Sequence, residues 1–348
     1  MKTIKIGDRI IGEGHPVFII AEAGVNHNGD IKIAKKLVDV ASAANADAIK
    51  FQTFKTDELV TPYTPSADYQ IKNIGKKQTQ FEMLKQLELD YKDFIKLKEY
   101  CDKKNIIFLS TSHTFDAIDF LEDLVPAYKF GSGDITNIPA LEYAASKHKP
   151  MIISTGMATI KEIKTAVDTI RRQKNNKIVC LHCTTNYPCP PNEVNLRSMI
   201  FIRNKLNCLV GYSDHTLGIL VPLLAVSMGA CVIEKHFTLR KDLIGPDHKA
   251  SLEPHELNEL IKKIREVEII LGEFEKKPTD SEKKLKKIVR KSLVAEQNIR
   301  RGSILKREMI SIKRPEGGIP PRFIDRVIGR RAKRNIRKNE FIKFSDIE

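Results

Sequence analysis

Short runs of apolar residues recur eight times along the chain, and most of them are followed by a helical pattern. The runs cover residues 17–21, 46–51, 106–109, 127–130, 150–153, 177–181, 207–211 and 230–233. They are continuous and rich in Ile and Val, which is typical of parallel strands covered on both faces. Eight strand–helix repeats in about 270 residues predict an α/β protein with a (β/α)8 TIM barrel. A doubly wound open sheet is the alternative that periodicity leaves open.

Three of the intervening helices have clear start and stop signals. Asp30 can cap a helix over residues 31–41, and Thr159 with Glu162 forms a capping box before another apolar stripe. Pro254 opens a helix that Gly272 ends. These signals place helices directly after the first, fifth and eighth apolar runs.

The texture of the sequence changes after Gly272. We expect a TIM-barrel domain over residues 1–272, a charged and polar linker over 273–289, and a small β-rich domain over 290–348, where short Ile and Val runs alternate with Gly and Pro. Two domains also agree with a length of 348 residues, beyond the roughly 250–300 residues at which a single core stops growing.

The net charge of +15 is concentrated in the last fifth of the chain. Residues 281–348 contain 21 Lys and Arg against 8 Asp and Glu. Such a tail can bind nucleic acid through phosphates, steer an anionic metabolite, or form a solvated surface. The tail has no zinc-finger spacing, RNP-like aromatic motif or heptads, so we expect no nucleic-acid partner.

Composition places the chain among soluble globular proteins. Hydrophobic residues make up 41% and charged residues 30%. The N-terminus has no secretory signal pattern, and the longest apolar stretch, residues 217–233, contains Gly218 and Pro222, so we expect neither export nor a membrane partner. Six scattered cysteines in so large a chain predict reduced thiols in the cytoplasm.

In a TIM barrel, functional side chains gather at the C-terminal ends of the strands. Polar residues do cluster at the predicted ends: Glu22, Lys50, Gln52, Ser110, Thr111, Lys129, Ser132, Asp134, Ser154, Thr155, His182, Thr184, Thr185, Asn186, Ser213, Asp214, His215, Glu234, Lys235 and His236. His27, His113 and His248 lie near the same rim.

Two of these residues are candidate metal ligands. His215 follows the seventh predicted strand and His236 the eighth, so adjacent strands would aim two imidazoles at one point. Neutral imidazole suits Mn, Fe, Zn or Co, and two histidines leave positions open for water and substrate oxygens. The alternative is that one or both histidines are buried in the core, or contact a metal ligand instead of binding the metal themselves.

Two lysines end strands among apolar residues, where an ammonium group is costly unless it meets an anion. Lys50 and Lys129 could hold a phosphate or carboxylate together with nearby serine hydroxyls, or pair with Glu22 or Asp134. A Schiff-base lysine is a third option. Glu22 and Asp134 are candidates for general acid and base, or for partners of those lysines.

Two loops add to the predicted site. Residues 26–30, Asn-His-Asn-Gly-Asp, form a turn and helix cap that could also touch substrate. Residues 53–80 make an unusually long connection after the second strand, and long connections on this face of a barrel are commonly lids or substrate walls.

The motifs together resemble the sialic acid synthase family, which includes N-acetylneuraminate, legionaminate and pseudaminate synthases. The matching stretches are IAEAGVNHNGD (20–30), KFQTF (50–54), GSGDITN (131–137), STGMATI (154–160), LHCTTNYPCPPNEVNL (181–196), GYSDHTLG (211–218), EKHFTL (234–239) and GPDHKASLEP (245–254). The tail, with KRPEGGIPP (313–321) and VIGRRA (327–332), is similar to the family's antifreeze-like SAF domain.

The resemblance implies an enzyme that condenses phosphoenolpyruvate with the open-chain aldehyde of an N-acylated mannosamine-type sugar, giving a nonulosonic acid and phosphate. It implies a divalent cation, Mn²⁺ with Mg²⁺ or Co²⁺ as alternatives, on His215 and His236, and a domain-swapped homodimer in which Arg314 reaches the partner's barrel. It further implies catalytic roles for Glu22, Asp134 and Lys50. The residues implied to bind phosphoenolpyruvate are Lys50, Lys129, Ser132, Ser154, Asn186 and Ser213, and those implied on the sugar side are Gln52, Tyr187 and Asp247. Thr111 is a further substrate-binding candidate.

The chain departs from the family pattern at two places. Many members have Glu where this chain has Asp134, and the family often has Pro-Phe where this chain has Ser112-His113. The first departure retracts the carboxylate by one methylene, and the second changes the sugar-side wall. Pseudaminate synthesis therefore stays an alternative to neuraminate or legionaminate synthesis. A metal-dependent pyruvate aldolase on the same barrel, and a nucleic-acid-binding protein acting through the basic tail, are the competing functions.

Overall fold

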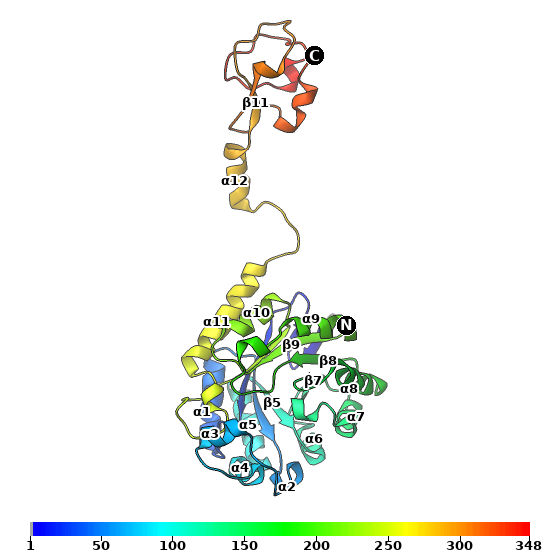
Figure 1. The fold of residues 1–348 in the computed structure, drawn as a ribbon, viewed down its shortest axis with the longest axis vertical. Coiled ribbons are helices and arrows are strands. Elements are labelled where there is room, and N and C mark those ends of the chain that lie inside the picture. The colour runs from blue at the N-terminus through cyan, green and yellow to red at the C-terminus, as the bar shows by residue number, and fades with distance from the viewer. Residues whose placement is uncertain (1–2) are drawn as a thin grey trace. The chain divides into compact units, whose positions relative to one another are not determined.

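The computed structural model describes residues 3–348, and the chain divides into two compact units, one ending at Gly272 and the other beginning at Glu273. The first unit is a closed barrel of eight parallel strands with helices around it (Figure 1). The strands are β3 (Phe18–Gly24), β4 (Ala48–Thr53), β5 (Ile107–Ser112), β6 (Tyr128–Phe130), β7 (Met151–Ser154), β8 (Ile178–His182), β9 (Leu209–Asp214) and β10 (Val232–His236). This confirms the predicted TIM barrel and excludes the open sheet.

The barrel closes because β10 pairs with both β3 and β9. All eight strands are almost wholly buried, which explains why they appear in the sequence as continuous apolar runs rather than as alternating ones. Several strands extend past the predicted ends, so Glu22, Gln52, Thr111, Ser213 and His236 lie on strand positions. Their side chains are therefore fixed by strand geometry.

Helices follow the strands and bury one face each against the barrel. They are α1 (Ile31–Ala43), α5 (Tyr91–Lys103), α6 (Phe115–Leu121), α7 (Ile138–Ser146), α8 (Ile160–Arg172), α9 (Arg197–Leu206), α10 (Leu220–Ser227) and α11 (Pro254–Leu271). The Asp30 carboxylate accepts from the Lys32 backbone N–H, and Thr159 with Glu162 closes a capping box. The predicted caps of α1 and α8 are confirmed, as is the start of α11 at Pro254.

An N-terminal hairpin lies at the strand-start end of the barrel. It consists of β1 (Thr3–Ile6) and β2 (Arg9–Gly12). At the turn, a Cβ on Gly7 would lie 3.1 Å from Ile107 at the start of β5 and 3.9 Å from Pro126, just before β6. Ile4, Ile6 and Ile11 of the hairpin belong to the main hydrophobic core. The opposite, C-terminal ends of the strands remain available for a site.

The long connection after β4 folds into three short helices, α2 (Thr56–Leu59), α3 (Asp68–Ile74) and α4 (Gln80–Leu87). Val25, Phe54, Met83 and Leu87 form a small apolar cluster separate from the main core, and this cluster fixes the insertion over the barrel mouth. Sequence periodicity did not resolve these helices because each is too short to show a full stripe.

The second unit has a core of its own. Helix α12 (Asp280–Val289) lies in the segment predicted as a linker and buries none of its residues. The strands β11 (Ser292–Ala295) and β12 (Ile310–Lys313) pair antiparallel, and isolated antiparallel bridges and 3₁₀ turns complete the small domain. This confirms the predicted β-rich domain. Its core residues are Leu293, Ala295, Ile299, Leu305, Ile310, Ile319, Val327, Ala332, Ile336, Ile342 and Ile347.

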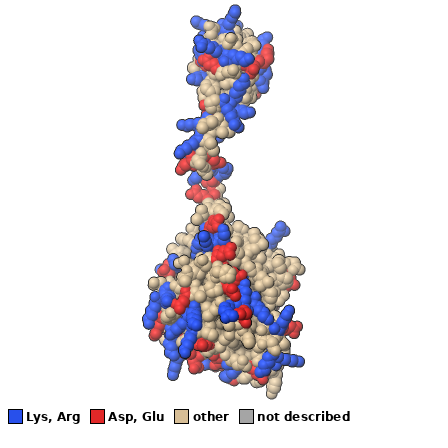
Figure 2. All heavy atoms as spheres, turned by 90° about the vertical axis from the view of Figure 1, so that its left-hand side faces the viewer, with Lys and Arg blue, Asp and Glu red and all other residues tan. Residues whose placement is uncertain are grey.

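Figure 2 shows Lys and Arg side chains spread over the visible surface of the second unit, with acidic side chains among them. Some of these charges are neutralised locally. Arg334 contacts both Asp346 and Glu340 at 2.7 Å, and Lys313 pairs with Glu296 at 3.1 Å. None of the helices within residues 3–348 has the length and hydropathy required of a membrane span.

Candidate active site

Four charged side chains meet inside the C-terminal end of the barrel. Lys50 Nζ lies 2.8 Å from Glu22 Oε2 and 3.7 Å from Glu234 Oε2, and Lys129 Nζ lies 3.6 Å from Glu234 Oε1. Glu22 and Lys50 are register partners on the adjacent strands β3 and β4, so their side chains point the same way. Each of the four residues is at most 4% exposed. Glu234 therefore bridges two lysines in a water-poor interior.

Three hydroxyl groups complete this cluster. Thr111 accepts from Lys50 Nζ at 2.9 Å, and Ser154 accepts from Lys129 Nζ at 2.7 Å. Ser213 donates to Glu234 at 2.8 Å. Buried charges need such partners, because an ammonium or carboxylate without hydrogen bonds would lose its hydration without replacement. The network holds both lysines at fixed positions.

The electrostatics of the cluster set its protonation. Burial, reinforced by the neighbouring Glu234 carboxylate and opposed by Lys50, raises the pKa of Glu22 to about 7. Burial alone would also raise the pKa of Glu234, but the two lysines outweigh it and lower the value to about 2. Burial lowers the pKa of Lys129, whereas the carboxylates outweigh burial at Lys50 and raise its pKa. With Glu22 protonated, two lysines face one carboxylate, which favours an anionic ligand.

A lysine–carboxylate ion pair was the expected alternative. Lys50 and Glu22 form such a pair, whereas Asp134 does not pair with either lysine. In the structure Asp134 Oδ2 lies 3.1 Å from His113 Nδ1 instead. Asp134 sits on a 3₁₀ turn after β6, while Lys129 lies on the strand itself and points into the barrel axis. Asp134 is thus placed beside the His113 imidazole at the outer rim of the mouth.

The two candidate metal ligands lie side by side at the ends of β9 and β10. The ring centroids of His215 and His236 are 5.6 Å apart, and both residues are 6% exposed. Burial lowers the pKa of each imidazole, so both rings are neutral. His215 Nδ1 contacts the Thr184 carbonyl at 2.7 Å, and therefore carries the proton, while Nε2 accepts from the Tyr187 hydroxyl at 2.9 Å.

These residues fit a divalent cation at an open site. His236 Nδ1 is buried without a hydrogen-bond partner, and the tautomer of His215 leaves its Nε2 with a lone pair. Among residues 3–348 no group of three or more His, Cys, Asp and Glu side chains forms a metal-binding cluster. Two neutral imidazoles suit a first-row cation whose remaining positions are taken by water and substrate.

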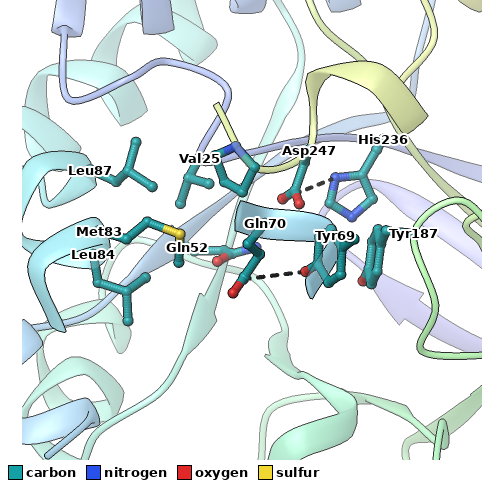
Figure 3. Close-up of a pocket in the computed structure, with 11 residues that line it drawn as sticks. Val25, Gln52, Tyr69, Gln70, Met83, Leu84, Leu87, Tyr187, His236 and Asp247 are labelled. Atoms are coloured by element: carbon teal, nitrogen blue, oxygen red, sulfur yellow. Dashed lines mark hydrogen bonds and ion pairs between the residues drawn. The ribbon is translucent and has the colours of Figure 1, made fainter. Parts of the chain in front are cut away.

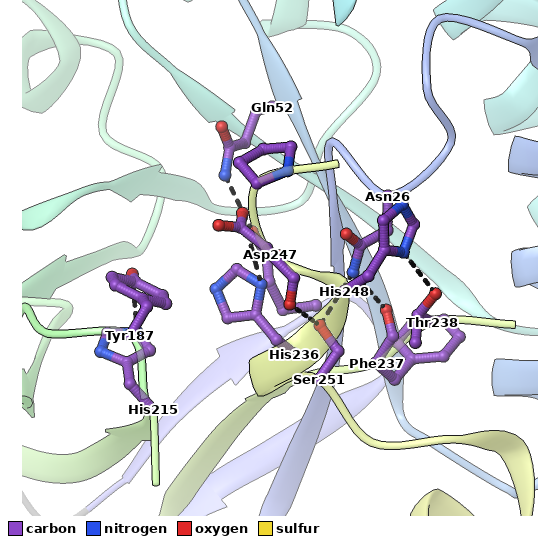
Figure 4. A network of polar contacts seen from close by, with 12 residues as sticks. Asn26, Gln52, Tyr187, His215, His236, Phe237, Thr238, Asp247, His248 and Ser251 are labelled. Atoms are coloured by element: carbon purple, nitrogen blue, oxygen red, sulfur yellow. Dashed lines mark hydrogen bonds and ion pairs between the residues drawn. The ribbon is translucent and has the colours of Figure 1, made fainter. Parts of the chain in front are cut away.

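A polar network holds the loop that follows β10 (Figure 4). Asn26 Nδ2 donates to the Phe237 carbonyl and to Ser251, and Ser251 donates to the Asp247 carbonyl at 2.7 Å. These contacts place the Asp247 carboxylate 4.0 Å from His236 Nδ1. Burial raises the pKa of Asp247 to about 6. The Asn-His-Asn turn thus positions a carboxylate beside a candidate metal ligand.

His248 extends the same network. Its Nδ1 contacts the Thr238 hydroxyl at 2.6 Å, and its Nε2 contacts the side-chain oxygen Oδ1 of Asn28 at 3.2 Å. Burial lowers the pKa of His248 to about 4, and likewise that of His27. His182 contacts the Val194 carbonyl at 2.7 Å. These three histidines near the rim are neutral structural groups.

A pocket of about 150 Å³ opens beside His236 (Figure 3). The insertion after β4 forms one wall, as expected for a long loop on this face. Gln52, Tyr187 and Asp247, the predicted sugar-side residues, all line it. Gly24, at a bulge in β3 and with φ of +54°, allows this convergence: a Cβ there would lie 3.3 Å from Glu22, 3.4 Å from Gln52 and 3.5 Å from His236.

The remaining predicted residues are placed differently. Ser132 accepts from the Gly156 backbone N–H at 3.0 Å and contacts Cys183 Sγ at 3.1 Å, on the β6 side of the mouth. Asn186 is exposed and lies 3.4 Å from Glu193. Arg314 is exposed in the second unit. Glu234 was not assigned a role from the sequence, although its position at the end of the eighth strand was the available signal.

The fold and the site define a TIM-barrel enzyme whose polar centre combines two buried lysines with two metal-competent histidines. The sequence model of the NeuB family matches residues 37–276, and that of the SAF domain matches residues 290–348. The chain belongs to the NeuB family, which confirms the resemblance found in its motifs.

Individual relatives agree with this assignment. The chain is 46% identical to N,N'-diacetyllegionaminic acid synthase of Legionella pneumophila, over 97% of this chain and 96% of the relative. It is 45% identical to the Campylobacter jejuni enzyme of the same name, over 93% and 98% respectively. The crystal structure of N-acetylneuraminic acid synthetase from Leptospira borgpetersenii, in complex with citrate, superposes with a TM-score of 0.73 at 37% identity, covering 82% of this chain and 95% of that one.

Proposed function

We propose that this enzyme condenses phosphoenolpyruvate with the open-chain form of 2,4-diacetamido-2,4,6-trideoxymannose, producing N,N'-diacetyllegionaminate and phosphate. The observation that supports the reaction class is the pair of buried lysines, Lys50 and Lys129, next to His215 and His236 at the barrel mouth. The 45–46% identity to two enzymes named for this product supports the choice of sugar.

The reaction forms one carbon–carbon bond and breaks one carbon–oxygen bond. C3 of phosphoenolpyruvate attacks the aldehyde carbon of the sugar, and water adds to C2. The bond between C2 and the bridging oxygen then breaks, and phosphate leaves with that oxygen. One proton of the water ends on the former aldehyde oxygen and the other on the departing phosphate, so no oxidant or reductant is needed.

The two lysines hold the anionic substrate. Phosphoenolpyruvate has a carboxylate and a phosphate, and Lys50 and Lys129 offer two buried ammonium groups whose positions are fixed by Thr111 and Ser154. Charge-assisted hydrogen bonds in a site of low dielectric are stronger than those in water. Ser132, Ser213 and Asn186 are the further candidates for contacts to this substrate.

Glu22 moves the proton between water and the sugar oxygen. Its pKa of about 7 places both protonation states within reach at neutral pH, as a general acid–base group requires. Gln52 Nε2 lies 3.4 Å from Glu22 Oε1 and lines the pocket, so Glu22 is close to the sugar side. Asp134, held by His113, is the second candidate acid–base group.

His215 and His236 would hold the divalent cation, Mn²⁺ with Mg²⁺ or Co²⁺ as alternatives. When bound, the cation supplies Lewis-acid polarisation of the aldehyde. The chain itself contributes the orientation of His215 through the Thr184 carbonyl, and the Asp247 carboxylate near His236. Tyr187 packs on His215, with ring centroids 4.0 Å apart and ring planes tilted by 32°, and closes the sugar side.

The enzyme works as a homodimer in the cytoplasm. Helix α12 leaves Leu285 and Ile288 56% and 64% exposed, apolar surface that a second chain would cover. Arg314, an exposed residue of the second unit, is the candidate for a contact to the partner's barrel. All six cysteines are free thiols, as a reducing compartment requires. Light scattering coupled to size exclusion measures the mass in solution, and a mass of 39.5 kDa at micromolar concentration would contradict the dimer.

Phosphate release from phosphoenolpyruvate with added Mn²⁺ tests the proposal. The acceptors are N-acetylmannosamine, 2,4-diacetamido-2,4,6-trideoxymannose and 2,4-diacetamido-2,4,6-trideoxyaltrose, whose products are neuraminate, legionaminate and pseudaminate. We expect release that needs both the metal and the second sugar, with oxygen-18 from labelled water in the product and none in the phosphate. No release with any acceptor from folded, metal-loaded protein would contradict the proposal. Condensation of a sugar with pyruvate supplied in place of phosphoenolpyruvate would indicate an aldolase.

A further inference from the structure

The pocket beside His236 has two chemically different ends (Figure 3). Gln52, Tyr187, His236 and Asp247 form a polar end, whereas Met83, Leu84 and Leu87 of helix α4 form an apolar end together with Val25. In Figure 3 these leucines and Met83 lie at one side of the cavity and the histidine at the other. A ligand that spans the pocket must therefore change from polar to apolar along its length.

The apolar end is rigid. Met83, Leu87 and Val25 are between 3% and 7% exposed and pack together in the small cluster described above. The last turn of α4 is fixed because Glu88 accepts from the backbone N–H and the hydroxyl of Thr56, at 2.9 and 2.8 Å.

The helix also packs closely on the turn after β3. A Cβ at Gly29 would lie only 2.5 Å from the Gln86 carbonyl oxygen, and Gly29 has φ of +73°. The glycine of the Asn-His-Asn-Gly-Asp motif thus permits the approach of α4 to the barrel mouth. The wall is formed before any ligand binds, which favours selective recognition.

Polar groups near the apolar end are already engaged. Gln70 Oε1 accepts from the Ala67 backbone N–H at 2.9 Å, and its Nε2 donates to the Tyr69 hydroxyl at 3.3 Å. Gln52 Nε2 is directed to Glu22. None of the residues lining this pocket is Lys or Arg. A phosphate at the apolar end would find no cation among the lining residues, and a hydroxyl would face Val25, Met83, Leu84 and Leu87, whose side chains have no oxygen or nitrogen.

The charged groups of the site fix the orientation of the acceptor sugar in the pocket. Its aldehyde must lie near His236 and the buried lysines, because the groups that act on it are there. The opposite terminus of an open-chain hexose, C6, then reaches towards α4. A methyl group at C6 would be buried against Met83 and Leu84, whereas a hydroxymethyl group would lose its hydration without compensation.

We propose that Met83 and Leu84, supported by Val25 and Leu87, form a binding wall for the terminal methyl group of the acceptor and thereby select 6-deoxy sugars over 6-hydroxy and 6-phosphorylated ones. This inference rests on the proposed function and assigns its sugar specificity to named residues. Discrimination by an apolar wall of this kind is about 10- to 100-fold in kcat/KM.

The test compares two acceptors that differ only at C6, 2,4-diacetamido-2,4,6-trideoxymannose and 2,4-diacetamido-2,4-dideoxymannose. Phosphate release with phosphoenolpyruvate and Mn²⁺ gives kcat/KM for each. We expect the wild-type enzyme to prefer the 6-deoxy sugar at least about tenfold. Leu84→Gln, at a half-buried position, should lower this ratio at least about threefold by giving a 6-hydroxyl a partner.

Ile95→Gln serves as the matched control, because it makes the same kind of change on the exposed side of α5, at 42% exposure. It should leave the ratio unchanged, and circular dichroism should show both variants folded. Equal kcat/KM for the two sugars, or an unchanged ratio in Leu84→Gln, would overturn the wall while leaving the proposed synthase intact.

Failure of the synthase itself has a different signature. If no phosphate is released with any sugar, the proposed function is wrong. Calorimetric binding of the two sugars to the full-length protein then tests by itself whether the wall selects 6-deoxy sugars. Tighter binding of the 6-deoxy sugar that Leu84→Gln abolishes would support it. Equal or absent binding of both sugars would overturn it.

Discussion

His113 Nδ1 lies 3.1 Å from Asp134 Oδ2, so the two positions at which this sequence departs from the common pattern of its family contact each other. His113 directly follows β5, and Asp134 lies on the turn after β6. β5 and β6 are adjacent strands of the barrel. Phe54 packs edge-on against the imidazole, with ring centroids 6.3 Å apart, and fixes its orientation. The Asp134 side chain, which is shorter than the glutamate found in many members, is thus contacted by the imidazole of His113.

This contact predicts that the two residues act as a unit. Asp134→Asn and His113→Phe should each lower kcat/KM for the acceptor. The kcat/KM of the double variant should be no lower than that of the less active single variant. Coupling energies between contacting residues are about 0.5–3 kcal/mol. A double-mutant cycle on phosphate release measures the coupling. Strictly additive losses would show that the contact has no functional role.

Glu234 is predicted to be the residue on which the buried charge cluster depends. In Glu234→Ala, Lys129 would lose its carboxylate and Lys50 would keep only Glu22. Removing one partner of a buried ion pair costs about 3–5 kcal/mol, because the remaining charge stays buried. Urea unfolding at pH 7 measures the loss. Lys85→Ala, which breaks an exposed pair with Asp57, is the control and should change stability by less than about 1 kcal/mol.

The raised pKa of Glu22 predicts a definite pH dependence of stability. The folded state keeps the proton up to about pH 7, whereas the unfolded chain releases it near the ordinary value of 4.5. The folded state therefore binds more protons in this window, and the contribution of Glu22 to stability falls as the pH rises from about 4.5 to about 7.

Glu22→Gln should remove this slope, because the amide does not titrate. Urea unfolding of both proteins at intervals from pH 5 to pH 8 measures the difference in slope. A parallel pH dependence of the two proteins would show that Glu22 is ionised throughout the window.

The two histidines and Tyr187 should affect metal binding in opposite ways. His215→Ala and His236→Ala should abolish Mn²⁺ binding and turnover, since each removes a candidate ligand. Tyr187→Phe should bind Mn²⁺ at least as well as the wild type, because the tyrosine hydroxyl occupies His215 Nε2 in the structure. Electron paramagnetic resonance of free Mn²⁺ measures the affinities. Full Mn²⁺ affinity in either alanine variant would exclude that histidine as a ligand.

Much of the architecture was predictable because it depends on local or periodic features. The eight apolar runs became the eight strands, since strands covered on both faces consist mostly of apolar residues. The polar residues at the ends of those runs reached one site because parallel strands in a barrel share one C-terminal rim. That His215 and His236 lie side by side could be predicted on this ground alone, because one follows β9 and the other ends β10.

The partners of each side chain were decided by the tertiary structure. The sequence placed Lys129 and Asp134 only five residues apart, but strand and turn direct them to different surroundings, and Lys129 meets Glu234 from the far side of the barrel. The three short helices over the mouth were also not predicted. Each is too short to show a full apolar stripe in the sequence, and their apolar residues become buried only by packing against Val25 and Phe54. Sequence order fixes which side chains arrive at the rim, whereas barrel closure and the angles of its turns fix which of them touch.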